Sequence, residues 1–370
     1  MIICFLADAS SLHTYRWIQY FAGKGHQVHL ISFQEFSYNP IENLSVHIIK
    51  PILKNKGKIF SYLANKFVNI FINPIKVKKM IRTINPDILH AHYLTDYGLL
   101  GYFMHFPVSV ISVWGSDILI EPKKSFFRKI MAKLIINSSK LVTCDSNSVR
   151  NECLKYCKHP EKIEIILGVD LSTFRERKNY LTKYSNFIIL SSRGFRPIYN
   201  VDSIVKSIPY VIEKYPNVKY ILKTLPGSQN PELQQLAVSL NVIKYTEFIS
   251  KMIDFNELPE MLFSVDIFIS VPSSDSSSIS LLEAMACGLP VIVSDIPSNH
   301  EWITDGWNGF IVPIRNPEKL ANAIIQLIEK PDLMQIFGER NAQIIRDRAD
   351  REKNMAHMEN LYQQLIEKYK

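Results

Sequence analysis

The residues with the clearest chemical potential are two carboxylates, Asp275 and Glu283, which flank a serine-rich segment. An apolar run precedes this segment, and Gly288 followed by Pro290 ends the helix that we expect after it. The pattern predicts a strand, a loop and a helix with Ser280 as its N-cap. Free backbone N–H groups at a helix start favour a phosphate, and serine hydroxyl groups add donors without bulk. The serines concerned are Ser277, Ser278 and Ser280. The sequence therefore predicts an anion-binding loop with Glu283 one turn inside the helix, within reach of a hydroxylated ligand.

A purely structural interpretation of the same segment also fits. Ser280 and Glu283 have the spacing of a capping box, in which the glutamate bonds back to the backbone N–H of the serine. Asp275 has no capping task at its distance, and an ordinary tight loop would use glycine or asparagine where this chain has serine. Both interpretations stay open, and Asp275 with the serines favours a ligand site.

The segment resembles the donor-site signature of family 4 glycosyltransferases, which have the GT-B fold. The likeness consists of a carboxylate, seven residues, a glutamate and then Ala-Met-Ala-Cys-Gly-Leu-Pro-Val-Ile-Val-Ser-Asp. In that family the first carboxylate, usually Glu, contacts the donor sugar, backbone amides hold sugar and diphosphate, and the second Glu binds the ribose hydroxyls. The resemblance assigns these roles to Asp275, to the amides of Ser278, Ile279 and Ser280, and to Glu283. Asp275 is one methylene shorter than the usual Glu, which bears on the sugar that is held.

Apolar runs alternate with helical segments through both halves of the chain, a pattern typical of doubly wound parallel α/β domains. A length of 370 residues with 47% apolar residues suffices for two cores. The resemblance, which also includes the runs 168–174 and 301–313, implies the GT-B fold: two Rossmann-like domains facing a central cleft. We expect an N-terminal acceptor-binding domain, a linker, a nucleotide-sugar-binding domain and a final helix that crosses back to the first domain, over 1–170, 171–186, 187–349 and 350–370.

Transfer of a sugar from a nucleotide requires that the departing diphosphate be neutralised, by a metal on paired carboxylates or by fixed cations. No Asp-x-Asp occurs in the sequence, whereas Arg193 and Arg196 follow an expected strand and Lys223 follows the next. The family normally carries an Arg and, about five residues on, a Lys. Arg193 matches the Arg, the Lys position falls on Tyr199, and Arg196 is the expected substitute. Lys223 also fits a surface charge. We therefore expect no metal and no cofactor, and the missing Gly-x-Gly-x-x-Gly gives dinucleotide binding no support.

The resemblance implies that acceptor contacts come from the first half. His13 and Arg16 occupy the loop where the family commonly has paired glycines, His92 ends a strand, and Trp114 replaces a frequent family His. The predicted acceptor-binding residues are His13, Arg16, His92, Trp114 and Asp117. Packing explains each histidine equally well, and His90 is expected to pack. Similar proteins transfer with retention through a front-face displacement, in which the leaving phosphate oxygen helps to deprotonate the acceptor.

We therefore predict a retaining hexosyltransferase with Asp275 and Arg193 at its reacting centre. It would move a sugar from a nucleotide sugar, expected to be a UDP-sugar, to a glycan or lipid-linked acceptor in cell-surface polysaccharide or glycoconjugate assembly. One alternative is a non-catalytic scaffold subunit that binds a nucleotide sugar or glycan, with Asp275 and the missing Lys as signs of decay. The other is a GT-B-fold sugar-nucleotide epimerase, although no segment demands its base.

Charge is uneven: residues 1–180 hold 24 Lys and Arg against 13 Asp and Glu, which leaves 19 against 22 in the rest of the chain. Basic residues gather at 54–58 and 76–79, which flank an apolar helical pattern, and at Lys123, Lys124, Arg128, Lys129 and Lys133. We expect this half to dock on an anionic membrane surface, with a solvated helix as the alternative. No nucleic-acid motif accompanies the charge. Without an apolar span or signal peptide, and with five cysteines, the expected location is the cytoplasm, with a peripheral place on the cytoplasmic membrane face.

Overall fold

The computed structural model describes residues 1–49, 73–176, 187–224, 231–250 and 257–370. The chain forms two compact units. Unit 1 contains Met1–Ile166 and Met355–Lys370, and unit 2 contains Leu167–Asn354. Phe174, which lies inside the predicted linker 171–186, is buried in the core of unit 2, and residues 177–186 lie outside the described part.

Unit 1 is built on a parallel sheet of seven strands in the order β3-β2-β1-β4-β5-β6-β7. The strands are β1 (Ile2–Leu6), β2 (Gln27–Ser32), β3 (Leu44–Ile48), β4 (Ile88–His92), β5 (Ser109–Ser112), β6 (Leu141–Cys144) and β7 (Ile163–Ile165). Strand β1 is an unbroken apolar run because helices cover both faces of the sheet, so alternation with polar residues is not required.

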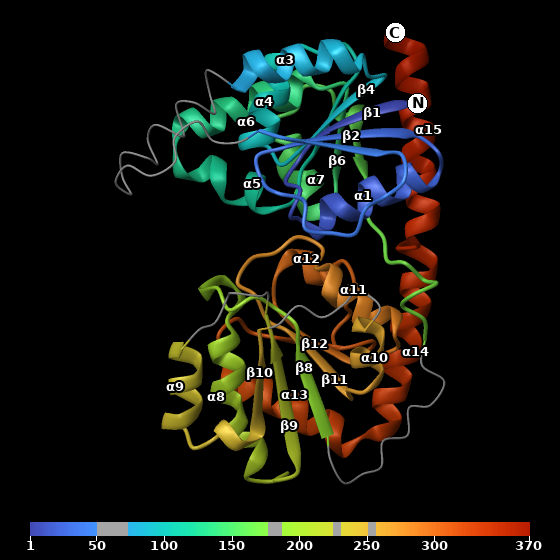
Figure 1. Cartoon of the computed structure of the whole chain (residues 1–370). Helices are drawn as coiled ribbons and strands as arrows, with labels where there is room; N and C mark the ends of the chain where they lie inside the picture. Colours follow the sequence, from blue (N-terminus) through green and yellow to red (C-terminus); the bar gives the residue numbers. More distant parts are fainter. Residues whose placement is uncertain (50–72, 177–186, 225–230, 251–256) are drawn as a thin grey trace. The chain divides into compact units, whose positions relative to one another are not determined.

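Helices lie on both faces of this sheet (Figure 1). One face shares its core with α3 (Asn73–Ile84), α4 (Asp96–Met104), α5 (Ser116–Leu119), α6 (Phe126–Ser138) and α7 (Asn147–Leu154). The other face shares its core with α1 (Leu12–Gly23) and with the last helix, α15 (Arg351–Tyr369). Helix α15 begins in unit 2, and its residues Met355, Met358 and Tyr362 are buried in the core of unit 1.

Unit 2 is built on a parallel sheet of six strands in the order β10-β9-β8-β11-β12-β13. The strands are β8 (Phe187–Ser191), β9 (Val218–Lys223), β10 (Thr246–Ile249), β11 (Ile267–Ser270), β12 (Val291–Ser294) and β13 (Phe310–Val312). One core contains α8 (Val201–Ile212), α9 (Pro231–Ser239), α13 (Pro317–Glu329) and the start of α14 (Pro331–Arg348). The opposite core contains α10 (Leu258–Phe263), α11 (Ile279–Ala286) and the end of α14, and the short helix α12 (Pro297–His300) follows β12.

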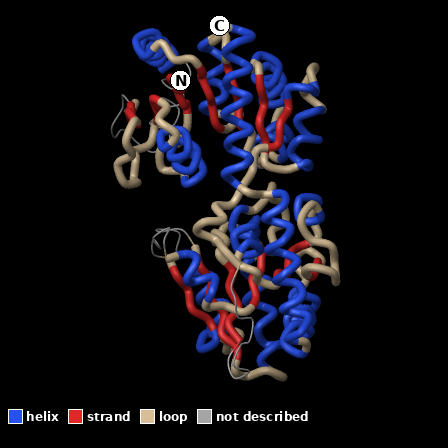
Figure 2. The backbone as a smooth tube through the Cα atoms, turned by 90° about the vertical axis from the view of Figure 1, so that its right-hand side faces the viewer, coloured by secondary structure: helices blue, strands red, loops and turns tan. Residues whose placement is uncertain are grey.

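The two parallel-sheet α/β domains predicted from the sequence are confirmed, and Figure 2 shows the strands of each unit layered between helices. In each sheet, the direction in which successive strands are added reverses once. In unit 2 the chain runs outward from β8 through β9 to β10 and then returns to place β11 on the other side of β8. In unit 1 the same reversal occurs between β1 and β4. Ligands of open α/β sheets bind at the carboxyl ends of strands beside such a reversal, so the loops after these strands are where a site is expected.

Candidate functional site

Arg193 is the centre of the polar cluster in unit 2. It follows β8 and meets the loop that follows β11, because these two strands are neighbours at the reversal. Its Nη2 donates to Asp275 Oδ2 at 2.5 Å, and its Nη1 donates to Ser278 Oγ at 2.5 Å and Ser280 Oγ at 3.4 Å. Its guanidinium carbon lies 4.5 Å from the ring centre of Tyr199. Arg193, the predicted cation, therefore contacts the predicted carboxylate Asp275 and the predicted serines Ser278 and Ser280.

The carboxyl group of Asp275 is partly shielded from water. Burial raises its pKa, and Arg193 and the backbone N–H of Ser276 oppose this rise. That N–H donates to Asp275 Oδ1 at 3.1 Å. Side-chain exposure is 11% for Arg193 and 18% for Asp275, so the pair is shielded without being sealed from water. A ligand can reach these groups without unfolding the loop.

Helix α11 begins two residues earlier than expected. Ser278, not Ser280, is its N-cap residue: the backbone N–H of Leu281 donates to Ser278 Oγ at 3.4 Å. The prediction of Ser280 as N-cap is therefore wrong, and the capping box that depended on it loses its first member. Ile279 becomes the first helical residue, and the Oγ atoms of Ser278 and Ser280 lie 3.1 Å apart. The free N–H end of the helix thus coincides with the Arg193 contacts.

Glu283 lies in α11 and is only 4% exposed. Lys223, the last residue of β9, provides a nearby positive charge: burial lowers its pKa, and the charge of Glu283 opposes this effect. Lys223 is thus half-buried beside the predicted ribose-binding carboxylate, which does not fit a freely solvated surface charge. Ser277 has a bracing contact, since Trp302 Nε1 donates to its Oγ at 2.9 Å.

Arg196 stands apart from this cluster. Its side chain is exposed, and the contacts of the described residues do not join it to Arg193 or Asp275. Tyr199 occupies the position where the family's Lys was expected, and its ring packs over Arg193. A Cβ at Gly194 would lie 3.3 Å from the Tyr199 ring, so a side chain there would require a small shift of the ring.

Several buried polar atoms at this sheet edge have no partner within the described residues. They are Arg193 Nε, Ser191 Oγ, Thr224 Oγ1 and Ser270 Oγ. These residues end or follow β8, β9 and β11, which are adjacent in the sheet. Buried polar groups in folded proteins nearly always have a hydrogen-bond partner, so this edge is suited to a polar ligand. Ser191, Thr224 and Ser270 were missed from the sequence, where their position at strand ends was the only signal.

Asn200 fixes the loop that carries Asp275. It adopts a left-handed conformation with φ of 49° at the start of α8. Its Nδ2 donates to Val271 O at 2.9 Å and Ser273 Oγ at 2.7 Å, and its Oδ1 accepts from Arg315 Nε at 3.1 Å. No sequence pattern pointed to this residue.

In unit 1, three of the five predicted acceptor residues come together. The rings of His13 and Trp114 have centres 4.8 Å apart, and those of His92 and Trp114 are 5.5 Å apart. Trp17, which was not predicted, packs edge-on against both His92 and Trp114. These residues follow or end β1, β4 and β5, which are neighbours at the reversal of unit 1. The result is an aromatic group at the carboxyl ends of these strands.

His92 is 3% exposed, and neither of its ring nitrogens has a hydrogen-bond partner in the described part of the chain. Burial lowers its pKa to about 3, with His13 contributing, so the ring is neutral at physiological pH. His90 packs as expected, with Ser112 Oγ 2.8 Å from its Nε2 and Tyr362 at its Nδ1.

Asp117 and Arg16 are the other two predicted acceptor residues. Asp117 is buried, and its carboxylate accepts the backbone N–H groups of Leu94 at 2.9 Å and Trp114 at 3.1 Å. Burial raises its pKa to about 6 despite these bonds. Its carboxylate therefore braces the loop that carries Trp114, because backbone donors occupy both oxygens. Arg16 lies near Tyr38, whose pKa is raised by burial and lowered in part by the Arg16 charge.

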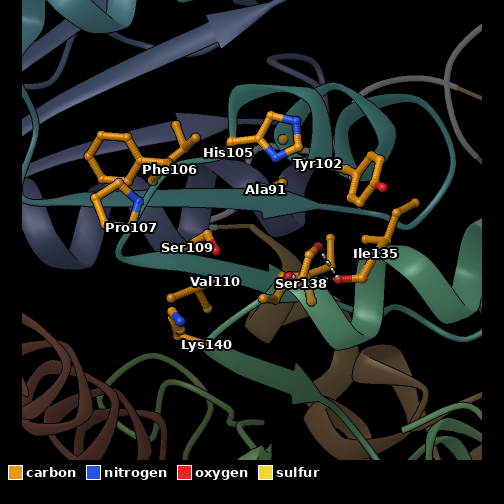
Figure 3. A pocket seen from close by; sticks show the side chains of 15 residues that line it. Ala91, Tyr102, His105, Phe106, Pro107, Ser109, Val110, Ile135, Ser138 and Lys140 are labelled. Carbon is orange, nitrogen blue, oxygen red and sulfur yellow. Dashed lines mark hydrogen bonds between the residues drawn. The ribbon is translucent and has the colours of Figure 1, made fainter. Parts of the chain in front are cut away.

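Unit 1 also contains a cavity of about 250 Å³ between α4, α6, β4 and β5 (Figure 3). Its lining includes Ser109, which begins β5, and Lys140, which precedes β6. The cavity therefore lies toward the amino ends of these strands, away from the His92 and Trp114 edge. Ligands of open parallel α/β sheets bind at the carboxyl ends of the strands. We therefore do not include this cavity in the candidate functional site.

Among the described residues, no helix combines the length and hydropathy needed to cross a bilayer. Nor do three His, Cys, Asp or Glu side chains of this part stand close enough to hold a metal ion together.

Comparison with known proteins gives two family models that match consecutive parts of the chain. One, described as glycosyl transferase 4-like, matches residues 2–146, and the other, described as glycosyl transferases group 1, matches residues 172–344.

Among relatives, the chain is 24% identical over 365 residues to N-acetyl-alpha-D-glucosaminyl L-malate synthase of Bacillus anthracis, covering 93% of this chain and 91% of that protein. It is 24% identical over 336 residues to UDP-Gal:alpha-D-GlcNAc-diphosphoundecaprenol alpha-1,3-galactosyltransferase of Escherichia coli, covering 82% and 84%. The structure of sucrose-phosphate synthase of Thermosynechococcus elongatus superposes on this chain with a TM-score of 0.81, at 16% identity and over 99% of both chains. This likeness concerns the fold alone. Since the two models match one sheet unit each, the chain belongs to the family 4 glycosyltransferases and has the GT-B fold.

Proposed function

We propose that this chain is a retaining glycosyltransferase that moves a hexosyl group from a UDP-sugar to a glycan or a lipid-linked acceptor in glycoconjugate assembly. The observation that carries the proposal is the convergence of Arg193 on Asp275, Ser278 and Ser280 at the N-terminus of α11. Family membership supplies the reaction class. The choice of UDP and of a lipid-linked acceptor is supported by the E. coli relative, whose name specifies both.

Arg193 and the start of α11 are the proposed diphosphate site. The guanidinium supplies a fixed cation, and the helix start supplies free N–H groups and a positive dipole end. Arg193 Nε is buried without a partner in the described residues, so it has a donor left for a phosphate oxygen. Lys223 adds a second cation close to this site. These groups would neutralise the departing diphosphate without a resident metal ion.

Glu283 is the proposed ribose-binding residue, and Asp275 the proposed sugar-binding residue. A carboxylate only accepts hydrogen bonds, which suits the paired hydroxyl groups of a ribose. Glu283 is buried, and Lys223 compensates its charge. Asp275 shares Arg193 with the diphosphate site, so a sugar on Asp275 would have its anomeric carbon next to the cation that stabilises the leaving group.

The proposed transfer takes place on one face of the sugar. The bond from the anomeric carbon to the phosphate oxygen breaks, and a bond from the acceptor oxygen forms on the same face. The acceptor proton passes to the departing phosphate oxygen, so no separate strong base is required. Arg193 stabilises the negative charge that develops on the diphosphate.

His13, His92 and Trp114 are the proposed acceptor surface of unit 1. Trp114 offers a half-buried aromatic face of the kind that packs on a sugar ring. Neutral His92 has one donor and one acceptor nitrogen, both without partners in the described residues.

A transfer assay tests the proposal. The purified protein is incubated with UDP-sugars and diphosphate-lipid acceptors, and the anomeric configuration of the product is read by NMR. If the sugar is linked to UDP by an axial bond at its anomeric carbon, we expect the product to have an axial bond at the same carbon. Glu283→Gln should weaken donor binding roughly 10- to 100-fold, as loss of hydrogen bonds to a charged group implies. Glu318→Gln, on the exposed start of α13, is the matched control and should be unchanged.

Three other outcomes would overturn parts of the proposal. Inverted product would refute the front-face course. Binding of a donor without turnover by any acceptor would favour the scaffold alternative. An isomerised sugar released without any acceptor would favour an epimerase.

A further inference from the structure

The cavity of about 250 Å³ in unit 1 is apolar on its inner side (Figure 3). The side chains there come from β4, β5 and α6 and belong to the core of the unit: Leu89, Ala91, Ile111 and Ile135. Each of them is at most 4% exposed. A buried water molecule needs about two to four polar partners, and these side chains supply none. The inner side of the cavity therefore favours an apolar group over water.

Helix α4 leaves this space open because two of the residues that line the cavity are glycines. A Cβ at Gly101 would lie 3.2 Å from Ala91 Cβ, and a Cβ at Gly98 would lie 3.0 Å from Ile111 Cδ1. The helix therefore lies close to the sheet and has no side chain at these two positions to fill the space between α4 and α6. The cavity is thus a consequence of the sequence of α4.

Hydrogen-bond donors line the more exposed side of the same cavity. They are the side chains of Tyr102, His105, Ser109 and Lys140, all partly or fully exposed. Figure 3 shows His105 and Tyr102 on one side of the cavity and Lys140 on the other. In the described part of the chain these four side-chain donors have no hydrogen-bond acceptor. An ionised carboxylate only accepts hydrogen bonds, so such a group suits this side.

Two lysines make this end of the cavity positive. Lys140 has no carboxylate partner among the described residues, and its Nζ lies 4.4 Å from the ring centre of Tyr369 in α15. Lys162 Nζ donates at 2.8 Å to the carbonyl oxygen of Ser139, another residue that lines the cavity. Burial lowers the pKa of Lys162, and the nearby charge of Lys140 contributes. Two cations so close together favour an anion between them and the apolar side.

His105 occupies a backbone position where glycine is usual. It follows the last residue of α4 in the left-handed conformation, with φ of 48°, which strains any residue that has a Cβ. This position brings its imidazole ring to the cavity, where the ring centre lies 5.8 Å from that of Tyr102. Glycine at position 105 would relieve the strain and remove the ring, so His105→Gly tests the ring without threatening the fold.

We propose that this cavity binds a small organic carboxylate with one compact apolar group, such as an aromatic acid. The apolar group would lie against Leu89 and Ile135, and the carboxylate would accept hydrogen bonds on the side of His105, Ser109 and Lys140. An engineered cavity of about 150 Å³ holds benzene, so a cavity of about 250 Å³ has room for a ring with a short acidic chain. Free phosphate would leave the apolar side unmatched, and a hydrocarbon would leave the cations unmatched.

The inference is independent of the proposed function. The cavity lies toward the amino ends of β4 and β5, whereas the proposed acceptor residues His92 and Trp114 lie at the carboxyl ends of these strands and the donor residues belong to unit 2. A ligand in the cavity would occupy neither substrate site.

Titration by ligand-observed NMR tests the proposal with three probes: 3-phenylpropionate, the neutral 3-phenylpropionamide and inorganic phosphate. For a ligand of about eleven non-hydrogen atoms, we expect the acid to bind with a dissociation constant of roughly 0.1–4 mM. The amide and phosphate should each bind roughly tenfold more weakly or worse, because each lacks one half of the match. Equal binding of acid and amide would overturn the assignment to a carboxylate, and equal binding of acid and phosphate would overturn the role of the apolar side.

Variants locate the ligand. Lys140→Gln and His105→Gly should each weaken binding of the acid roughly three- to tenfold, since each removes a partly exposed donor. Lys129→Gln makes the same change of charge on an exposed residue of α6 that does not line the cavity, and it should bind like wild type. Ser109→Leu should fill the cavity and abolish binding of the acid. Melting curves check that each variant is folded.

A crystal soaked with 3-(4-bromophenyl)propionate gives an independent location. The anomalous signal of bromine should appear between Leu89 and Ile135, and a signal elsewhere would overturn the site. Unchanged binding by a folded Ser109→Leu protein would do the same, as would wild-type protein that binds no acid at concentrations well above the expected range.

Discussion

Replacing Arg193 with alanine should destabilise unit 2 by roughly 2–4 kcal/mol at neutral pH. Removal of one member of a buried ion pair leaves the other as an uncompensated charge, a loss of about 3–5 kcal/mol for a fully buried pair. Arg193 and Asp275 keep 11% and 18% of their side-chain exposure, so solvent screening reduces this figure. Ser278 and Ser280 retain each other at 3.1 Å, so most of the loss falls on Asp275.

This loss should depend on pH in a defined direction. Burial raises the pKa of Asp275 above its usual value of 3.8, and Arg193 limits the rise. Without Arg193 the folded-state pKa rises further. A carboxyl whose pKa is higher in the folded state favours folding below its unfolded pKa and loses that contribution as pH rises through the folded value. The destabilisation by Arg193→Ala should therefore be largest at neutral pH and shrink as the pH falls toward 3.8.

Calorimetric melting of wild type, Arg193→Ala, Asp275→Asn and Arg193→Ala/Asp275→Asn measures the effect. For a unit of this size 1 kcal/mol corresponds to roughly 2–4 °C, so Arg193→Ala should lower the unit 2 transition by about 5–15 °C. The double variant should recover most of that loss, because the unpaired charge is gone. If the double variant melts no higher than Arg193→Ala at neutral pH, the ion pair is not what holds this loop.

Three further changes test other parts of the structure. Ser278→Ala removes the N-cap of α11 and should reduce stability by about 1 kcal/mol in urea unfolding; unchanged stability would contradict the cap. Gly168→Ala would place a Cβ 2.4 Å from Arg351 Cα, so unit 2 should lose about 1–3 kcal/mol in the same assay. Burial lowers the pKa of His92 to about 3 in the folded protein, whereas in the unfolded chain this residue takes up a proton below pH 6.5. Wild-type stability should therefore fall as the pH is lowered from 6.5 toward 3, by up to about 1.4 kcal/mol per pH unit from this group. His92→Phe should remove that slope, and equal slopes in the two proteins would contradict the burial of a neutral ring.

Much of the donor cluster was predictable because local sequence carries its signal. The serine-rich segment between Asp275 and Glu283 follows an apolar strand and precedes a helix, and parallel strands bring Arg193 to the same edge. The cap moved from Ser280 to Ser278 because helix ends depend on loop geometry that spacing alone does not define. Tyr199 could be located, but its packing over Arg193 depends on a three-dimensional contact that its sequence position does not reveal.

The first unit was less predictable, because its residues act through long-range packing. Asp117 has the sequence position of a site residue, yet its carboxylate is occupied by backbone N–H groups from two loops. Trp17 gave no signal, since an aromatic residue in an amphipathic helix ordinarily marks a core. The exposed apolar residues of α6, among them Phe126 and Phe127, gave no signal because an apolar residue in a helix is ordinarily expected to face the core.

Calorimetric titration of the protein with UDP, GDP and their sugar conjugates, in the presence of a metal chelator, tests the central claim most directly. The account predicts micromolar to millimolar binding of one nucleotide family, weakened roughly tenfold or more by Glu283→Ala and by Arg193→Ala, with melting curves confirming that each variant is folded at the titration temperature. Binding that appears only after a divalent metal is restored, or that Glu283→Ala leaves unchanged, would contradict a metal-independent donor site at the start of α11.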